Sequence, residues 1–287
     1  MKTTRCILCD SNDLKPSHQI EFENKNYLYD FCNNCNFTFQ NPWPTREIES
    51  IYNDKKYWNS SNVYNGKNGE KISENNYANY QNTRFKEAKE RYTKLKKFLT
   101  NTNGSILEIG CANGIFLNEW KKNGWKCLGV DPAKDMIDYG IKNFNLDLKC
   151  EKWEQLHLEL NTQDCIYMWG TDSNFYDFNL GFEKINKSLK INGIYALTYQ
   201  DFKHPIRKIF KQIKMQHNAL YNFSKKSIFY LMDKLGFKVL EHSITWQNTS
   251  LSHVKKILGL NTKGIDFRLK VPAVSYNLLI AQKIKNI

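Results

Sequence analysis

Short apolar runs alternate with amphipathic segments between residues 105 and 199, and this alternation constrains the fold more than any other feature. Helical periodicity at 115–123, 134–143 and 182–189 separates runs that have the length and composition of buried strands. These expected strands are 105–109, 126–130, 146–150, 164–168 and 194–199. Strands that alternate with helices form parallel sheets whose faces the helices cover. The chain is therefore expected to have an α/β core around one parallel sheet.

Segments on either side are expected to extend this core. Residues 82–99 carry apolar side chains at helical spacing, with Lys and Arg on the outer face. A helix at 224–235 and strands at 237–242 and 275–282 are expected to complete the sheet. The pair Asn192-Gly193 precedes the fifth strand of the core and predicts a turn there.

Four of the eight cysteines form two C-x2-C pairs, Cys6 with Cys9 and Cys32 with Cys35, separated by the 22 residues from 10 to 31. Four thiolates satisfy tetrahedral zinc and leave no open position for a substrate, which predicts a structural site. A bound metal would also explain how roughly 40 residues, too few for a self-sufficient core, hold a small β fold. The other cysteines lie singly in or beside apolar stretches and are interpreted as buried thiols: Cys111, Cys127, Cys150 and Cys165.

A loop of small residues, Glu108-Ile-Gly110-Cys-Ala112-Asn-Gly114, joins the first expected strand to its helix. A strand end beside a helix N-terminus forms a site for anions and nucleotides. A dinucleotide fingerprint needs glycines at 110, 112 and 115, where this chain has Gly110, Ala112 and Ile115, so nicotinamide binding is disfavoured. Asp131 ends the second strand, where its carboxylate can accept both ribose hydroxyls or cap the next helix.

Together, Glu108, the loop and Asp131 resemble the cofactor motifs of class I S-adenosylmethionine-dependent methyltransferases, with Ala112 in place of the middle glycine. The resemblance implies a Rossmann-like sheet with helices on both faces, preceded by a small zinc ribbon with four cysteine ligands. It also implies that Glu151 approaches the adenine amino group and that Trp169 lines the methionine end. The implied cofactor-binding residues are Glu108, Gly110, Ala112, Asn113, Gly114, Asp131, Glu151 and Trp169.

Nearly the whole chain resembles a group of bacterial methyltransferases that modify sugars during polysaccharide or secondary-metabolite synthesis. The resemblance includes the ribbon, an F-x-F-x-N-P-x-P stretch at 37–44, and the segment 217–227 with its following helix. It implies O-methylation of a saccharide, a nucleotide sugar or another phosphorylated intermediate. That group often carries Glu-His where this chain has Ser173-Asn174, so no catalytic histidine is expected there.

The expected organisation has four parts. Thr45 can cap a short helix at 45–52, and residues 58–80, rich in Asn, Ser, Gly and Lys, predict a loop or lid. The parts are a zinc ribbon at 1–44, a connecting helix and mobile loop or lid at 45–81, an S-adenosylmethionine-binding core at 82–200, and a basic acceptor-side region at 201–287 that completes the sheet.

A hydroxyl acceptor has to lose a proton, and the candidate bases that follow the carboxyl ends of the strands are Asp172, Asp177, His204, His217 and Tyr221. Three of them are taken as the catalytic candidates: His217, Asp172 and Tyr221. His217 is favoured because neutral imidazole accepts protons near pH 7 and because it lies in the acceptor-side region. A single histidine can equally be a hydrogen-bonded structural residue.

Positive charge is concentrated in residues 201–287, which contain 16 Lys and Arg but 4 Asp and Glu. This field suits an anionic partner such as a phosphorylated saccharide, although a solvated basic face is an equal reading. Mean hydropathy is −0.64, and no apolar run approaches the roughly 20 residues of a membrane span. The first residues lack the apolar stretch of a secretory signal. A cytoplasmic protein without transmembrane segments is expected, and its oligomeric state stays open.

Two alternatives remain. RNA methylation agrees with the ribbon and with a pI of about 9.2. Base amino-group methylases, however, usually carry Asn/Asp-Pro-Pro-aromatic after the fourth strand, and residues 168–175 do not. The second alternative is a scaffold with a degenerate methyltransferase fold. Against it stand Glu108, Gly110, Gly114 and Asp131, which are all intact.

Overall fold

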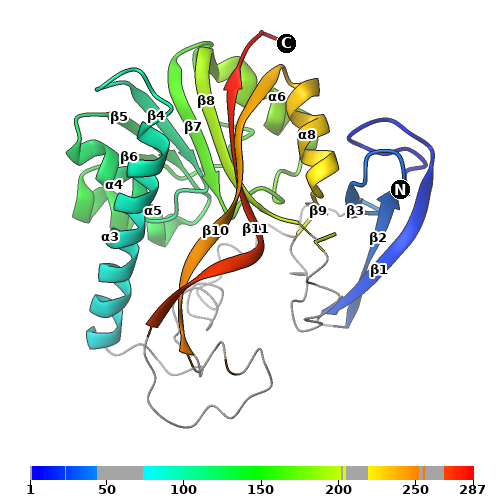
Figure 1. Ribbon diagram of the computed structural model, residues 1–287, viewed down its shortest axis with the longest axis horizontal. Coiled ribbons are helices and arrows are strands. Elements are labelled where there is room, and N and C mark those ends of the chain that lie inside the picture. Colours follow the sequence, from blue (N-terminus) through cyan, green and yellow to red (C-terminus); the bar gives the residue numbers. More distant parts are fainter. Residues whose placement is uncertain are drawn as a thin grey trace.

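The computed structural model describes the chain at residues 2–22, 24–43, 74–201, 203–204, 219–251, 255 and 268–287. Its strands form two sheets, one of seven strands in the order β10-β11-β8-β7-β4-β5-β6 and one of four in the order β1-β2-β3-β9 (Figure 1). Among the described helices, none has the length and apolar character needed to cross a membrane.

The large sheet is parallel at its centre and antiparallel at one edge. Strands β4 to β8 pair in parallel, whereas β11 runs antiparallel to β8, and β10 antiparallel to β11. β4 lies between β5 and β7, so the order of the strands reverses there and a crevice opens at their carboxyl ends. The strands are β4 (Ser105–Ile109), β5 (Lys126–Val130), β6 (Asp147–Lys149), β7 (Gln163–Trp169), β8 (Leu189–Gln200), β10 (Phe237–Ser250) and β11 (Arg268–Lys283).

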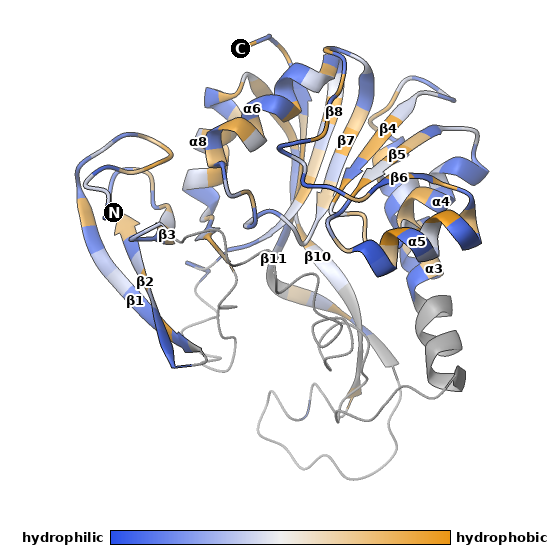
Figure 2. Ribbon diagram, turned by 180° about the vertical axis from the view of Figure 1, so that it is seen from behind, coloured by the Kyte–Doolittle hydropathy of each residue, from blue (hydrophilic) through white to orange (hydrophobic). Residues whose placement is uncertain are grey.

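Helices cover both faces of this sheet, and the apolar strands lie between them (Figure 2). One core joins alternate strand residues to α3 (Glu74–Lys96), α4 (Ile115–Lys122) and α5 (Lys134–Phe144). The other core joins the remaining strand residues to α6 (Phe178–Ser188) and α8 (Lys225–Lys234). Adjacent residues of β7 show the alternation, because Cys165 packs in the first core and Ile166 in the second. This arrangement confirms the expected α/β, Rossmann-like fold.

The structure confirms the expected strands at 105–109 and 126–130 residue for residue. The expected turn at Asn192-Gly193 is wrong, because both residues lie inside β8. There Asn192 has a φ of 66°, and the pairing with β7 shifts register between Gln163 and Cys165. Between the pairs Gln163 with Leu189 and Cys165 with Ile194, β8 advances five residues while β7 advances two, so the strand carries an insertion at this point. The expected helix at 45–52 lies outside the described residues, as does the first part, 58–73, of the loop expected at 58–80. The last part of that expected loop is wrong, because residues 74–80 belong to α3.

The small sheet contains a strand that the sequence did not predict. It consists of β1 (Leu14–Phe22), β2 (Lys25–Cys32), β3 (Thr38–Gln40) and β9 (Tyr221–Asn222). β9 pairs antiparallel with β3 through Thr38 with Asn222 and Phe39 with Tyr221. The strands β1 to β3 with the turns that hold the four paired cysteines, called the ribbon below, are therefore joined by backbone hydrogen bonds to a segment from the last third of the chain.

Candidate active site and metal centre

A cavity of about 260 Å³ opens at the carboxyl ends of β4, β5 and β7, where the strand order reverses. Its walls come from α3, from the loop between β4 and α4, and from the segments that follow β5, β6 and β7. Leu220, which directly precedes β9, completes the lining. The position agrees with the general rule that open α/β sheets bind ligands at such a reversal.

The loop between β4 and α4 turns through left-handed backbone conformations. The φ angles are 73° at Gly110, 47° at Ala112 and 69° at Gly114. A Cβ atom on Gly110 would collide with the side chain of Thr171, so the close approach requires glycine. Gly114 has a structural role, because a Cβ there would lie 2.7 Å from Leu146 Cδ1.

Asp131 joins this loop to the start of α5. Its Oδ2 accepts a hydrogen bond from the Ala112 amide at 2.9 Å, and its Oδ1 accepts one from the Ala133 amide at 2.8 Å. Burial raises the pKa of this carboxyl group. Asp131 does not cap α5, whose N-cap residue Ala133 has no side-chain cap hydrogen bond, but it holds the Ala133 amide and lines the cavity. Each carboxylate oxygen can still accept another hydrogen bond from a ligand.

Glu108 and Arg91 line the cavity, and each carries a buried polar atom without a hydrogen-bond partner in the described part of the chain. These atoms are Oε2 of Glu108 and Nη1 of Arg91. Burial raises the pKa of Glu108 to about 8. Burial lowers the pKa of Arg91 to about 9, which leaves the guanidinium charged at neutral pH. At neutral pH a charged Arg91 and a largely protonated Glu108 therefore line the cavity, and a bound cation would favour the ionised form of Glu108. The pair suits a ligand that carries both a cation and an anion.

The Arg91 guanidinium lies between two aromatic rings. Its Cζ is 3.7 Å from the ring centroid of Phe116 and 3.8 Å from that of Trp169. Stacking of this kind holds a planar cation in place. Its Nη2 lies 3.8 Å from Glu87 Oε2, so the ion pair engages one end of the guanidinium, while Nη1 at the other end has no hydrogen-bond partner among the described residues.

The structure brings together seven of the eight expected cofactor-binding residues. Besides Glu108, Gly110 and Asp131, the cavity is lined by Ala112, Asn113, Glu151 and Trp169. Asn113 also accepts a hydrogen bond from the Ile115 amide at 3.3 Å, at the first residue of α4. Gly114 is the exception, because it lies behind the lining. The binding role of these residues stays a prediction.

The three catalytic candidates have different positions. His217 lies outside the described residues. Asp172 follows the cavity-lining Thr171 and is itself buried, and burial raises its pKa to about 7. Tyr221 lies in β9 within an aromatic cluster, where its hydroxyl accepts a hydrogen bond from the Phe175 amide at 3.2 Å. Burial holds the pKa of Tyr221 well above its usual range, and these contacts favour a packing role. Catalysis by any of the three stays a prediction.

Sequence reasoning missed the two arginines of the cavity, Arg84 and Arg91. A signal was present, because Arg84, Ala88, Arg91 and Leu95 follow one another at helical spacing on one face of α3. Ala88 and Leu95 are buried in the core. An arginine within such an apolar stripe indicates either a buried ion pair or a ligand.

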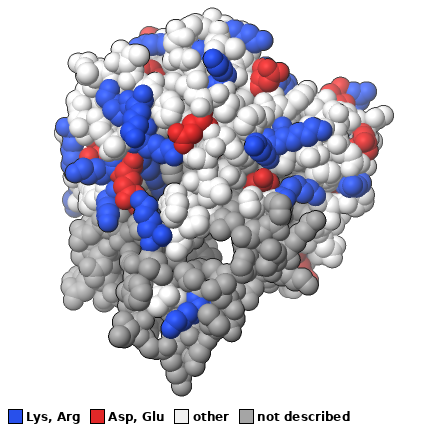
Figure 3. Space-filling view, in the orientation of Figure 1, with Lys and Arg blue, Asp and Glu red and all other residues white. Residues whose placement is uncertain are grey.

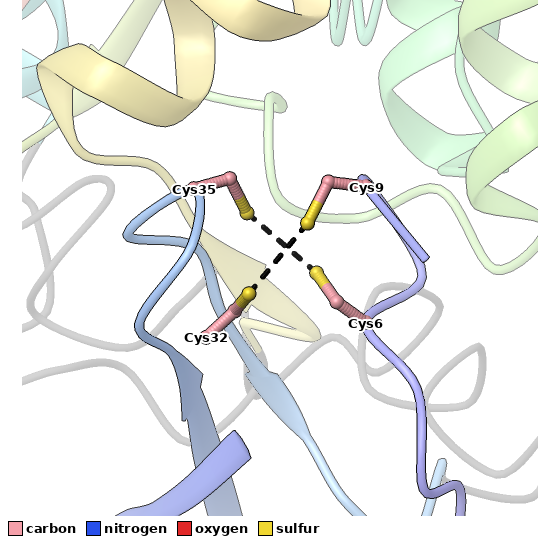
Figure 4. A group of neighbouring side chains, drawn as sticks. All are labelled: Cys6, Cys9, Cys32 and Cys35. Carbon is pink, nitrogen blue, oxygen red and sulfur yellow. Dashed lines mark hydrogen bonds between the residues drawn. The ribbon is translucent and has the colours of Figure 1, made fainter. Parts of the chain in front are cut away.

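The four paired cysteines meet at one point (Figure 4). Their Sγ atoms all lie within 4.8 Å of one another, and the distances from Cys6 to Cys35 and from Cys9 to Cys32 are both 3.6 Å. Tetrahedral zinc with Zn–S bonds of about 2.3 Å needs sulfur atoms about 3.8 Å apart, so the arrangement can hold such an ion. The contact with Cys35 lowers the pKa of Cys6 to about 6.

Local backbone structure accounts for this geometry. Each C-x2-C pair closes a turn, in which Asp10 N donates to Cys6 O at 2.8 Å and Asn36 N donates to Cys32 O at 2.9 Å. Asp10 and Asn36 have φ angles of 59° and 61°, a conformation that Asp and Asn tolerate better than most residues. Asn34 also donates to Cys9 Sγ at 3.5 Å, as a donor beside a thiolate ligand would.

The sheet order, the small-residue loop after β4 and the acid after β5 define a Rossmann-like enzyme of the class I methyltransferase type. The chain belongs to the methyltransferase-domain family, whose model matches residues 80–242. It is therefore a class I methyltransferase, and the expectation of an enzyme is confirmed.

Three solved structures illustrate the shared fold, although their sequences have low identity to this chain. Magnesium protoporphyrin IX methyltransferase from Synechocystis PCC 6803, with bound S-adenosylhomocysteine, is 10% identical with a TM-score of 0.54, covering 82% of this chain and 98% of that one. A protein from Pyrococcus horikoshii OT3 is 17% identical with a TM-score of 0.52, covering 81% and 100%. A protein described as a methyltransferase from Bacillus halodurans C-125 is 12% identical with a TM-score of 0.52, covering 68% and 100%. No match is found among curated proteins.

Proposed function

We propose that the cavity binds S-adenosylmethionine and that the enzyme methylates an oxygen of a saccharide, a nucleotide sugar or a related phosphorylated intermediate. The observation that carries the cofactor assignment is the pair of unpartnered atoms, Glu108 Oε2 and Arg91 Nη1, on two residues that line one cavity. The methionine part of this cofactor carries an ammonium and a carboxylate, which complement a buried acid and a buried guanidinium.

The remaining lining residues match the nucleoside part. Asp131 can accept the ribose hydroxyls while it keeps its two backbone hydrogen bonds. Glu151 follows β6 and lines the same cavity, where it can accept from the adenine amino group. When bound, the cofactor supplies an electrophilic methyl group on its sulfonium.

The protein's own task is to align the acceptor and to accept its proton. Asn174 lines the cavity but its amide cannot take a proton, so the base has to come from elsewhere. Asp172, with a pKa raised to about 7, and His217 are the proposed candidates. Either group would act as a base near neutral pH.

The acceptor class is supported by the basic composition of the acceptor-side region, 201–287, and by the resemblance to sugar-modifying methyltransferases. On the face shown in Figure 3, basic and acidic side chains are interspersed over the described residues. Ion pairs between described residues include Lys94 with Glu241 and Lys270 with Glu90. On the part of this face that the structure describes, mixed charge suits a small anionic acceptor better than a long nucleic acid.

Isothermal titration with S-adenosylmethionine and S-adenosylhomocysteine tests the cofactor site. We expect micromolar binding by the wild type, weakened at least about tenfold in Asp131→Ala and Arg91→Met because each loses charge-assisted hydrogen bonds. Lys89→Met, on the exposed side of the same helix, is the matched control and should bind normally. Absence of binding by folded wild-type protein would contradict the proposal.

Labelled methyl transfer from S-adenosylmethionine to a panel of nucleotide sugars, free saccharides and bulk RNA tests the acceptor. Transfer to a saccharide supports the proposed class, and transfer to RNA alone overturns it.

We also propose that zinc is the metal of the four cysteines, since soft thiolates in tetrahedral geometry favour it. Elemental analysis should find about one zinc per chain, and loss of that zinc in Cys32→Ser would identify the site.

A further inference from the structure

One wall of the cavity is formed by two segments that are far apart in sequence. Asn174, Phe175 and Tyr176 follow β7, and Leu220 precedes β9. Hydrogen bonds join them, because Leu220 N donates to Ser173 O at 2.9 Å and Phe175 N donates to the Tyr221 hydroxyl at 3.2 Å. We call residues 173–176 and 219–221 the outer wall.

Strands β2 and β3 of the ribbon hold the outer wall at Ala219 and Leu220. Gln40 N donates to Leu220 O at 2.8 Å, and the Tyr29 hydroxyl donates to Ala219 O at 2.7 Å. Gln40 Nε2 lies 3.1 Å from the same Ala219 oxygen. Tyr29 and Gln40 are both buried, so water does not compete for these hydrogen bonds.

Trp43 supplies a second link from the ribbon to the outer wall. Its indole Nε1 donates to Tyr176 O at 3.1 Å. Its ring stacks on Tyr221 with a centroid distance of 6.3 Å and an interplanar angle of 9°. The ribbon therefore contacts both segments of the wall.

These links originate next to the cysteines. Tyr29 lies in β2, which ends at Cys32, and Gln40 lies in β3, which follows Cys35. Cys32 N donates to Phe37 O at 2.9 Å, and Tyr29 pairs with Gln40 between the strands. A metal that fixes Cys32 and Cys35 would fix the register in which these two side chains are presented.

We propose that the ribbon positions the outer wall of the cavity, with Tyr29, Gln40 and Trp43 as positioning residues, so that cofactor binding depends on metal at the four cysteines. This proposal rests on the cofactor site proposed above. The ribbon is then part of the binding machinery, in addition to any local role in folding.

The test uses the full, zinc-loaded chain with two conservative variants, Trp43→Phe and Tyr29→Phe. Each keeps an aromatic ring and removes one hydrogen-bond donor to the wall. We expect zinc content to stay unchanged, amide exchange at 173–176 and 219–221 to become several-fold faster, and the S-adenosylhomocysteine Kd to rise about three- to tenfold. Trp246→Phe changes an exposed aromatic residue of β10 and should leave all three measurements unchanged.

A second arm removes the metal with a chelator. Faster exchange in the outer wall and at least tenfold weaker binding, with β4 and β5 still protected, support the proposal. Unchanged exchange and affinity in the metal-free chain overturn it. If the metal-free chain unfolds, the two zinc-loaded variants decide, and wild-type exchange and affinity in both overturn it. A zinc-loaded wild type that binds no cofactor contradicts the proposed function, while the exchange measurement still tests the positioning of the wall.

Discussion

Ala112 has a φ of 47°, in the left-handed region that glycine adopts more readily than any residue with a Cβ. A non-glycine residue there costs about 1 kcal/mol or more. Its amide donates to Asp131, so the structure holds the conformation in spite of this cost. The observation explains why this position matches glycine in related motifs.

Ala112→Gly is therefore expected to stabilise the cofactor-free chain by roughly 1 kcal/mol, because it removes the strain at this residue. The larger conformational entropy of glycine in the unfolded chain opposes this gain in part. Urea unfolding followed by circular dichroism measures the change. Ala88→Gly, in the middle of α3, is the opposite control and should destabilise by about 1 kcal/mol or more. Equal losses of stability in both variants would refute strain at Ala112.

Glu108 predicts a pH dependence of stability. Its pKa is about 8 in the folded protein and 4.5 in the unfolded chain, so the folded state binds the proton more tightly. This contribution to stability is complete below about pH 4.5 and is lost as pH rises through 8. Glu108→Gln removes this titratable group. Between these pH values the free energy of unfolding of the variant should therefore rise by a few kcal/mol relative to that of the wild type, since each pKa unit is worth about 1.4 kcal/mol.

Denaturant unfolding of wild type and Glu108→Gln at several pH values between 4.5 and 8 measures this difference. Comparing the two proteins cancels the pH dependence that comes from other carboxyl groups with raised pKa values, such as Asp172. A difference in unfolding free energy that stays constant with pH would show that Glu108 is ionised throughout.

A residue of the site could be predicted where its position shows in the sequence around it. Gly110 and Asp131 were predicted because strand ends fix their positions, and both line the cavity. Arg91 was missed because its place depends on how α3 packs against Phe116 and Trp169, residues distant in sequence. A charged residue on an amphipathic helix is usually solvated, so the sequence favoured an exposed position for Arg91 rather than one at the cavity.

Among the elements, α8 shows how side chains set a helix start. Ser224 and Ser227 form a capping box, in which each hydroxyl accepts from the other residue's amide, at distances of 3.2 and 2.8 Å. Both serines are buried, so water cannot replace these hydrogen bonds. The expected helix at 224–235 agrees with this element because such a cap is a local signal.

Ser224→Ala should lower the free energy of unfolding by about 1 kcal/mol, because a buried amide loses its acceptor. Thermal or urea unfolding measures the loss. Lys226→Ala changes an exposed residue in the same turn and should have almost no effect. A Ser224→Ala variant as stable as this control would show that the cap contributes nothing.

Elements with strong internal patterns were predicted, and elements made by pairing were not. β4 and β5 are short apolar strands of a parallel sheet, and their bounds matched. β9 has two residues, too few for any periodicity, and exists because β3 supplies its hydrogen bonds. β10 and β11 extend to Ser250 and from Arg268, beyond their expected bounds, because the two strands pair with each other past the edge of β8.

In the whole molecule, the ribbon and the large sheet share one apolar core. Cys6, Leu8 and Phe37 belong to the same buried cluster as residues of β7, β8, α6 and α8. Lys234 of α8 donates to Leu8 O at 3.0 Å. The sequence predicted both parts but not their union, since pairs such as Phe39 with Tyr221 are separated by most of the chain.

A shared core predicts that the zinc-loaded chain unfolds in one step. Opening the ribbon alone would expose Leu8, Phe37 and Phe39 together with Tyr221 on the other side of the contact, at about 1.5–3 kcal/mol for each large side chain. When the chain is heated, release of the metal can be followed with a chromogenic chelator and unfolding of the core by tryptophan fluorescence. The two curves should therefore have the same midpoint temperature. Both curves should move together when Ser224→Ala weakens α8, which packs in the same core. Metal release well below the fluorescence midpoint would instead make the ribbon an independent unit, and its control of the cavity wall would then be limited to temperatures below that first step.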